Sequence, residues 1–140
     1  MDFSMVGPSI MLGLGCLGSS IGCTIPSMAL HGVMTHIDEG HGKLIGLSAF
    51  PSSQAIYSFV LMVLMADKIR AGTLPPLTAI GIGFFIGLAL CVCSIFQGKV
   101  AATAIQASAK QPAIFGKCVT GVVIVETFAI FAFVFTLLIM

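Results

Sequence analysis

One carboxylate stands alone in the most apolar part of this sequence. Glu126 lies nine residues after Lys117 and fourteen before Met140, among aliphatic and aromatic neighbours. If this stretch is a membrane helix, Glu126 is ~14 Å from Lys117 and ~21 Å from Met140, near mid-bilayer. An ionisable group at that depth costs several kcal/mol and usually marks the path of an ion or a proton. A neutral glutamic acid that only joins two helices is the alternative.

A second polar group lies inside another apolar stretch, within residues 51–57. Ser53 and Tyr57 are four residues apart, and Gln54 and Tyr57 are three apart, so the three side chains share one face of a helix. Pro51 has no N–H and therefore frees a backbone carbonyl one turn earlier. Each of these groups alone is an ordinary hydrogen-bonding group between helices. Together they offer several oxygens at one depth, as a binding site does.

A third polar side chain, Gln97, lies at the end of another apolar stretch. It either marks the membrane edge, since Lys99 follows two residues later, or faces Glu126 if its helix extends beyond the lipid. Carboxylate, amide, hydroxyl and carbonyl oxygens suit a small hard cation such as Na⁺. A proton site needs only a suitable carboxyl with groups to steady it. The sequence therefore predicts transport of Na⁺ or H⁺ at Glu126, with no cofactor.

These groups have to be positioned by membrane helices. Of the 140 residues, 58% are hydrophobic and only 8% are charged, and the mean hydropathy is +1.14. A soluble domain of this size does not need so much apolar surface. The apolar runs are continuous and reach the about 20 residues that a crossing helix needs, so we predict an all-α fold with four transmembrane helices. Their approximate ranges are 5–33, 44–66, 77–96 (continuing to 109) and 118–140.

The two halves of the chain share a pattern. A Gly-Lys pair stands before the second helix of each half, at residues 42–43 and 116–117, and Gln54 and Glu126 follow it by similar distances. A duplicated helical hairpin explains this pattern, and a common apolar composition is the alternative. We expect a first hairpin at residues 1–70 and a second, ion-binding hairpin at residues 71–140.

Small residues are concentrated on the first and third helices. Such stripes let helix backbones approach closely in lipid. The second and fourth helices carry bulky Phe, Leu, Ile and Met instead, so we expect the first and third helices to form an inner layer. The stripes consist of Gly15, Ser19 and Gly22, and of Gly83, Gly87, Cys91, Ser94 and Gly98.

The charges outside the spans indicate an orientation. The net charge of +1 is too small to indicate nucleic-acid binding. Basic residues favour the cytoplasmic side, so the first and third loops are expected there and both termini outside. The first apolar run is longer than a signal-peptide core and lacks a basic leader, so we expect it to be retained. The basic residues concerned are Lys43, Lys99, Lys110 and Lys117 on one side, and Lys68 and Arg70 on the other.

Nearly the whole chain resembles the proteolipid subunit, called K or c, of V-type rotary ATPases and ATP synthases. The similarity is strongest toward bacterial members of about this length, chlamydial ones among them. Three motifs carry it: Pro51-Ser-Ser-Gln54-Ala-Ile-Tyr57, Gln97-Gly-Lys-Val-Ala-Ala102 with Ala104-Ile-Gln106, and Gly121-Val-Val-Ile-Val-Glu126-Thr-Phe-Ala-Ile.

The resemblance implies a protomer of a homo-oligomeric rotor ring in the bacterial inner membrane, in contact with membrane lipid. Glu126 would carry Na⁺ or H⁺ past a stator subunit that presents an arginine. Central-stalk subunits would attach to the cytoplasmic loops. The chain has no P-loop and is expected to be a non-catalytic subunit. A small four-helix proton-coupled antiporter is the alternative, although its multidrug-resistance type carries the glutamate in the first helix.

The resemblance also implies a set of ligands for Na⁺. Matched by motif, the side-chain ligands are Ser53, Gln54, Gln97 and Glu126. Tyr57 would bond to Glu126, and the backbone carbonyl before the proline would be that of Phe50. Ser53 departs from the family, in which threonine is usual. Serine keeps the hydroxyl but lacks the methyl group of threonine. This difference affects the expected affinity for Na⁺ more than the identity of the site.

Overall fold

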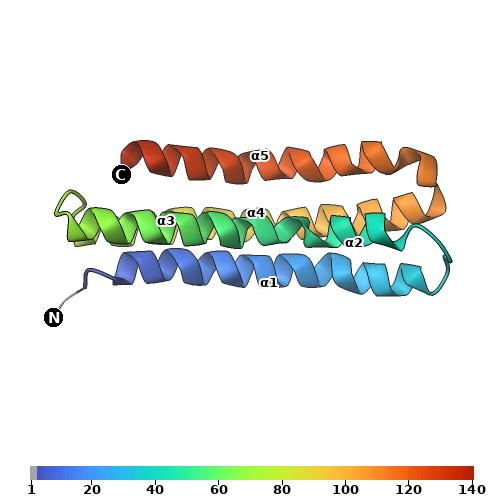
Figure 1. Ribbon diagram of the computed structural model, residues 1–140, viewed down its shortest axis with the longest axis horizontal. Coiled ribbons are helices and arrows are strands. Elements are labelled where there is room, and N and C mark those ends of the chain that lie inside the picture. The colour runs from blue at the N-terminus through green and yellow to red at the C-terminus, as the bar shows by residue number, and fades with distance from the viewer. Residues whose placement is uncertain (1–2) are drawn as a thin grey trace.

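The structure, a computed structural model, describes residues 3–140 and is built of long helices that lie side by side (Figure 1). Residues 1 and 2 lie outside the described residues. The expected first hairpin begins with them, and the expectation that the first apolar run lacks a basic leader also concerns them. The helices are α1 (Val6–Met34), α2 (His41–Ala49), α3 (Ser53–Arg70), α4 (Pro76–Lys110) and α5 (Phe115–Ile139), with short 3₁₀ turns η1 (Phe50–Ser52) and η2 (Pro112–Ile114).

Four helical spans are long and apolar enough to cross a membrane, which confirms the predicted all-helical fold. They form two hairpins, so α1 and α4 run in the same direction (Figure 1). The α1–α2 and α4–α5 connections lie together at one end of the molecule. The C-terminus and the start of α1 lie at the other. The spans are Val6–Met34, His41–Arg70, Pro76–Lys110 and Pro112–Ile139.

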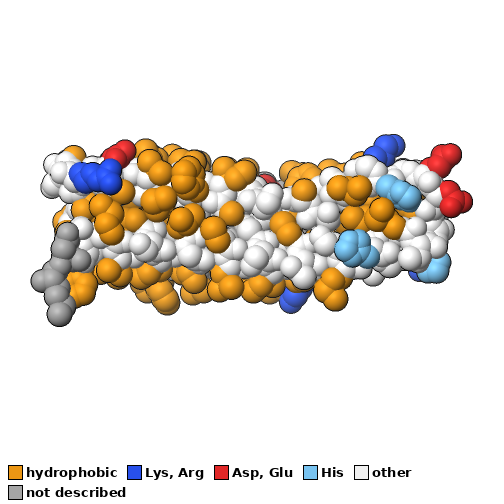
Figure 2. Space-filling model, turned by 60° about the horizontal axis from the view of Figure 1, so that its bottom comes forward, with side chains coloured by type: hydrophobic (Ala, Val, Ile, Leu, Met, Phe, Trp, Pro, Cys, Tyr) orange, Lys and Arg blue, Asp and Glu red, His pale blue; other side chains and the backbone are white. Residues whose placement is uncertain are grey.

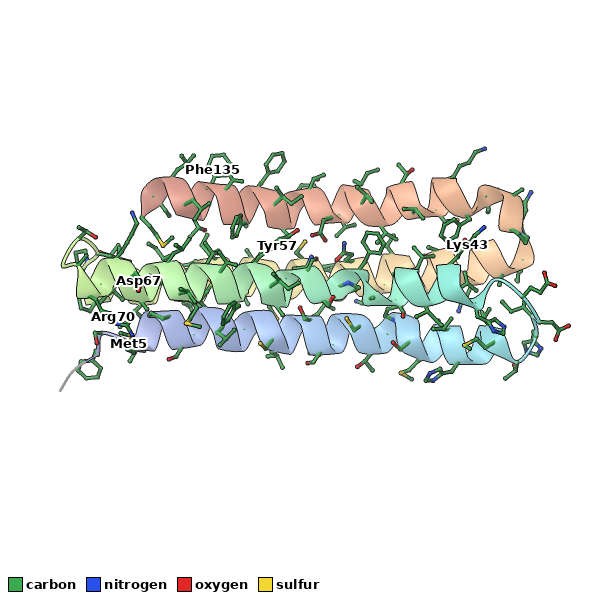
Figure 3. The ribbon with its side chains drawn as sticks, viewed as in Figure 1. Met5, Lys43, Tyr57, Asp67, Arg70 and Phe135 are labelled. Atoms are coloured by element: carbon green, nitrogen blue, oxygen red, sulfur yellow. The ribbon has the colours of Figure 1, made fainter. Side chains whose placement is uncertain are left out.

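Hydrophobic side chains cover the visible face along most of its length, and charged side chains gather mainly at the two ends (Figure 2). Lys43 lies at one end, and Asp67 and Arg70 lie at the other (Figure 3). A soluble protein would bury so much apolar surface, whereas a lipid-facing surface exposes it. The distribution of charge fits helices that cross a bilayer, while the predicted orientation stays a prediction.

Glycines bring α1 and α4 into backbone contact. A Cβ atom added at Gly18 would lie 2.8 Å from the carbonyl oxygen of Cys91, one at Gly83 would overlap the backbone of Gly7, and one at Gly7 would overlap the backbone of Ala79. The expected close packing of the first and third spans is therefore present. The α1 stripe also serves a second neighbour, because a Cβ atom at Gly15 would overlap Ser58 of α3.

The second span is not the continuous helix that the sequence predicted. It runs as α2, the 3₁₀ turn η1 and α3, and the turn contains Pro51. Proline has no N–H, and its ring crowds the carbonyl four residues earlier, so the α-helical ladder is interrupted there. The tighter 3₁₀ turn absorbs the interruption and keeps both parts of the span on one axis.

The last helix, α5, touches the rest of the chain along one narrow stripe. Only Val122, Ala129 and Thr136 are buried, at intervals of seven residues, or two helical turns. Large side chains on its other faces, such as Phe128 and Phe135, are more than half exposed. Most of α5 is therefore available to lipid or to a neighbouring chain.

We predict that Gly18→Ala destabilises the protein, because the new methyl group meets the backbone of Cys91 rather than a flexible side chain. Overpacking of this kind costs about 1–3 kcal/mol. Thermal unfolding in detergent should show a lower midpoint. Gly13→Ala on the same helix is the matched control, because a Cβ atom there meets nothing within 4 Å. Equal midpoints for the two variants would contradict the packing described here.

Candidate ion-binding site

Glu126 lies in the middle of α5, is partly buried, and accepts hydrogen bonds from two other helical spans. Its Oε2 atom accepts from Ser53 Oγ at 3.0 Å, from Gln54 Nε2 at 3.1 Å and from Gln97 Nε2 at 2.6 Å. Its Oε1 atom accepts from the Tyr57 hydroxyl at 2.6 Å. Four donors thus converge on one carboxylate, and each is a residue that the sequence singled out.

Gln54 and Gln97 are both fully buried and are bonded to each other. Gln54 Nε2 donates to Gln97 Oε1 at 3.0 Å. Gln97 therefore faces Glu126 from the interior, which is the second of the two alternatives that its position in the sequence allowed. Gln54 Oε1 is buried and has no hydrogen-bond partner among the described residues. A buried amide oxygen without a partner is costly and is the kind of atom that a cation satisfies.

The break at Pro51 places Ser53 at the start of α3 and directs its hydroxyl toward two oxygens. Ser53 Oγ lies 3.0 Å from the carbonyl oxygen of Phe50 and 3.0 Å from Glu126 Oε2. A hydroxyl has one proton and can donate it to only one of them. Three oxygens therefore meet at this point with a single proton between them.

Contacts on either side of Glu126 fix its helix relative to the donors. The Cys93 thiol of α4 donates to the Val125 carbonyl at 3.2 Å. The Tyr57 ring packs against Phe133, with ring centroids 5.4 Å apart. In Figure 3, Tyr57 lies between α3 and α5. The geometry of the site thus depends on α4 and α3 holding α5 in register.

Among residues 3–140, the hydrogen-bond partners of Glu126 are uncharged side chains. Within residues 3–140 the one ion pair joins Arg70 to Asp67 at 3.4 Å, at an exposed position. An open cleft of about 380 Å³ leads to the carboxylate and is partly lined by Phe50, Ser53 and Ile56. A side chain held this way can accept a proton or a small cation from the surface of the bundle.

The structure brings together all the side chains that the sequence proposed, with the Phe50 carbonyl beside them. The sequence pattern predicts only a packing role for two further serines near the site. Ser19 and Ser94 bond to the backbone on either side of the break at Pro51. The sequence gives one signal for them, namely small hydroxyl residues on the two helices that pack against a proline-broken span.

Comparison with known proteins identifies a family. Residues 6–65 and 80–139 each match the C subunit of ATP synthase. The chain is 35% identical over 99% of its length to the A-type ATP synthase subunit K of Methanocaldococcus jannaschii, and it spans 63% of that protein. It is 30% identical over 99% of its length to the V-type sodium ATPase subunit K of Enterococcus hirae, of which it covers 90%.

The two matched stretches confirm that the hairpin is duplicated. Both matches begin and end 74 positions apart. A pairing without gaps at that offset sets Lys43 against Lys117 and Ser52 against Glu126. Gln54, the expected counterpart of Glu126, lies two residues further along in that pairing. Together with the four apolar spans, these matches show that the chain is a multi-pass membrane protein of the ATP synthase C-subunit family, a proteolipid subunit of the V/A type.

Proposed function

We propose that this chain is one protomer of a homo-oligomeric rotor ring and that Glu126 carries Na⁺ through the membrane as the ring turns. The observation that carries the proposal is the convergence of Ser53, Gln54, Tyr57 and Gln97 on a single mid-span carboxylate. A glutamic acid that only joined two helices would bond to one neighbouring helix, whereas Glu126 accepts hydrogen bonds from both α3 and α4. Membership of the family favours the rotor over the alternative of a small antiporter.

Three observations support Na⁺ over H⁺ as the transported ion. Ser53 Oγ, the Phe50 carbonyl and Glu126 Oε2 converge with a single proton between them. The buried oxygen of Gln54 has no partner among the described residues. A half-turn of the Gln54 and Gln97 amides exchanges nitrogen for oxygen and would give hard oxygen ligands around the carboxylate. In addition, the relative from Enterococcus hirae is a subunit of a sodium ATPase.

The donor set explains how the site can alternate between two states. Without Na⁺, four N–H and O–H groups stabilise the ionised carboxylate. With Na⁺ bound, the charges of the ion and of Glu126 cancel, so a neutral unit crosses the lipid and the cost of a bare charge in hydrocarbon is avoided. A stator subunit presenting an arginine would compete for the carboxylate and release the ion.

The charges indicate the orientation, and the family resemblance implies the remaining partners. The connections at the Lys43 end would face the cytoplasm and attach to central-stalk subunits, with both termini outside and lipid around the ring. The membrane would be the inner membrane of a bacterium. The first hairpin (residues 1–70) would serve mainly as scaffold and ligand donor, and the second (residues 71–140) would carry the ion. The chain itself hydrolyses no nucleotide in this proposal; it is the rotor against which other subunits work.

Replacing the carrier removes transport without removing the fold. We predict that Glu126→Gln assembles into rings but abolishes Na⁺-dependent transport, because an amide cannot neutralise a cation. Ion uptake into vesicles that contain the assembled complex measures this. Asp67→Asn, an exposed acidic residue near the end of α3 that lies away from the proposed stalk contacts, is the matched control and should transport normally. Uptake at the control level by Glu126→Gln would refute the proposed role of Glu126.

Na⁺ should protect the carboxylate from chemical modification. We expect a hydrophobic carbodiimide to reach Glu126 through the open cleft that this residue lines and to label it, with mass spectrometry as the readout of the adduct. We predict that Na⁺ at neutral pH slows the labelling, whereas K⁺ at the same ionic strength does not, because the ligand set is small and hard. If Na⁺ leaves the rate unchanged, the carried ion is H⁺.

The buried glutamine of α4 should contribute to Na⁺ affinity. We predict that Gln97→Leu raises the Na⁺ concentration needed for half-maximal protection by at least about tenfold, because the variant loses an amide that contacts Glu126 at 2.6 Å. The matched control is Gln106→Leu, an exposed glutamine of the same helix. Equal protection of the two variants would exclude Gln97 from the ligand set.

A further inference from the structure

The break in the second span is bridged by hydroxyl groups from two other helices. In a regular α-helix the N–H of Ala55 bonds to the carbonyl of Pro51, four residues earlier. Here the Ala55 N–H donates to Ser19 Oγ of α1 at 2.9 Å. The Pro51 carbonyl accepts from Ser94 Oγ of α4 at 2.8 Å. Each backbone group at the break has therefore found a side-chain partner.

These bonds lie in a tightly closed part of the interior. Ser94 and Pro51 are fully buried, and Ser19 is 7% exposed. A Cβ atom at the neighbouring Gly22 would lie 2.8 Å from the Pro51 side chain. Water has no room to replace a missing hydroxyl, so removal of either serine leaves a buried backbone group without a partner.

The residues between the two bridged groups are the ones that contact the carboxylate. Ser53 and Gln54 lie between Pro51 and Ala55, and both donate to Glu126. Ser94 lies three residues before Gln97 on α4, so it shares a helix face with another donor of the site. One face of α4 therefore supplies a contact to Glu126 and also holds the turn that supplies two more.

The backbone around the break stands close to regular helix. Ser52 has φ −77° and ψ −19°, and Ser53 has φ −58° and ψ −34°, both in the right-handed helical region. A small change of these angles would let the Ala55 N–H return to the Pro51 carbonyl. The two serines thus compete with closure of the helix.

We infer that Ser19 and Ser94 are positioning residues, which keep the helix open at Pro51 and so hold Ser53 and Gln54 at the distance from Glu126 that ion binding requires. Neither serine contacts the carboxylate, and each acts through one backbone group. The inference rests on the proposed ion-carrying role of Glu126. It distinguishes the two serines from ordinary packing residues, whose loss lowers stability without changing the affinity of the site.

The test compares Ser19→Ala, Ser94→Ala and the double variant in membranes that contain the whole complex. The Na⁺ concentration for half-maximal protection of Glu126 from the carbodiimide should rise about ten- to a hundredfold in each single variant. In the double variant the two backbone groups can bond to each other, so thermal stability should recover toward wild type while the Na⁺ affinity stays low. Ser20→Ala is the matched control, because its hydroxyl is exposed and bonds only to the Leu17 carbonyl of its own helix.

Wild-type half-protection in both single variants would overturn the inference. If a single variant does not accumulate, the Na⁺ concentration for half-maximal protection is measured in the double variant instead, and a wild-type value there overturns the inference. If Na⁺ fails to protect even the wild-type protein, the choice of ion is wrong and the serines are judged by the rate of carbodiimide labelling at fixed pH. A changed rate in the variants then supports the positioning role, and an unchanged rate refutes it.

Discussion

A carboxyl group inside an apolar helix bundle needs hydrogen-bond partners from its neighbours, and this constraint organises the molecule. Glu126 takes its donors from α3 and α4, so α5 has to be held against both at one depth. Yet α5 buries only three side chains. Hydrogen bonds to the carboxylate, and the thiol contact at Val125, therefore contribute much of what fixes this helix within the protomer. The proposed ion carrier is thus also a structural group.

The inner helices make this arrangement possible because they are narrow. Glycines let the backbones of α1 and α4 touch, which leaves room for the side chains of α3 to reach across toward α5. The same stripe on α1 accepts the turn at Pro51. Small residues thus have two roles in this chain: they permit close approach, and where they carry hydroxyls they bond to the Ala55 N–H and the Pro51 carbonyl at the break.

The break at Pro51 shows how a local defect becomes a site. A proline inside a membrane helix exposes backbone groups that lipid cannot satisfy, so they have to be bonded by protein. At this break the Ala55 N–H and the Pro51 carbonyl bond to Ser19 and Ser94, and these bonds hold the first residues of α3. Ser53 and Gln54 are those residues, and their side chains reach the carboxylate. The break is therefore also what places these two polar side chains next to Glu126.

The sequence alone determined the four spans, the isolation of Glu126 and the pairing of the halves, because hydrophobic length and spacing along the chain carry that information. It also marked Gln54, Tyr57 and Gln97 as polar groups in apolar surroundings. It left open whether Gln97 faced the carboxylate, and it assigned Ser19 and Ser94 to packing. Only the tertiary structure decided these points, because the rotation of each helix about its axis depends on its neighbours. A difference of one residue in register turns a side chain by about 100°, from the site to the lipid.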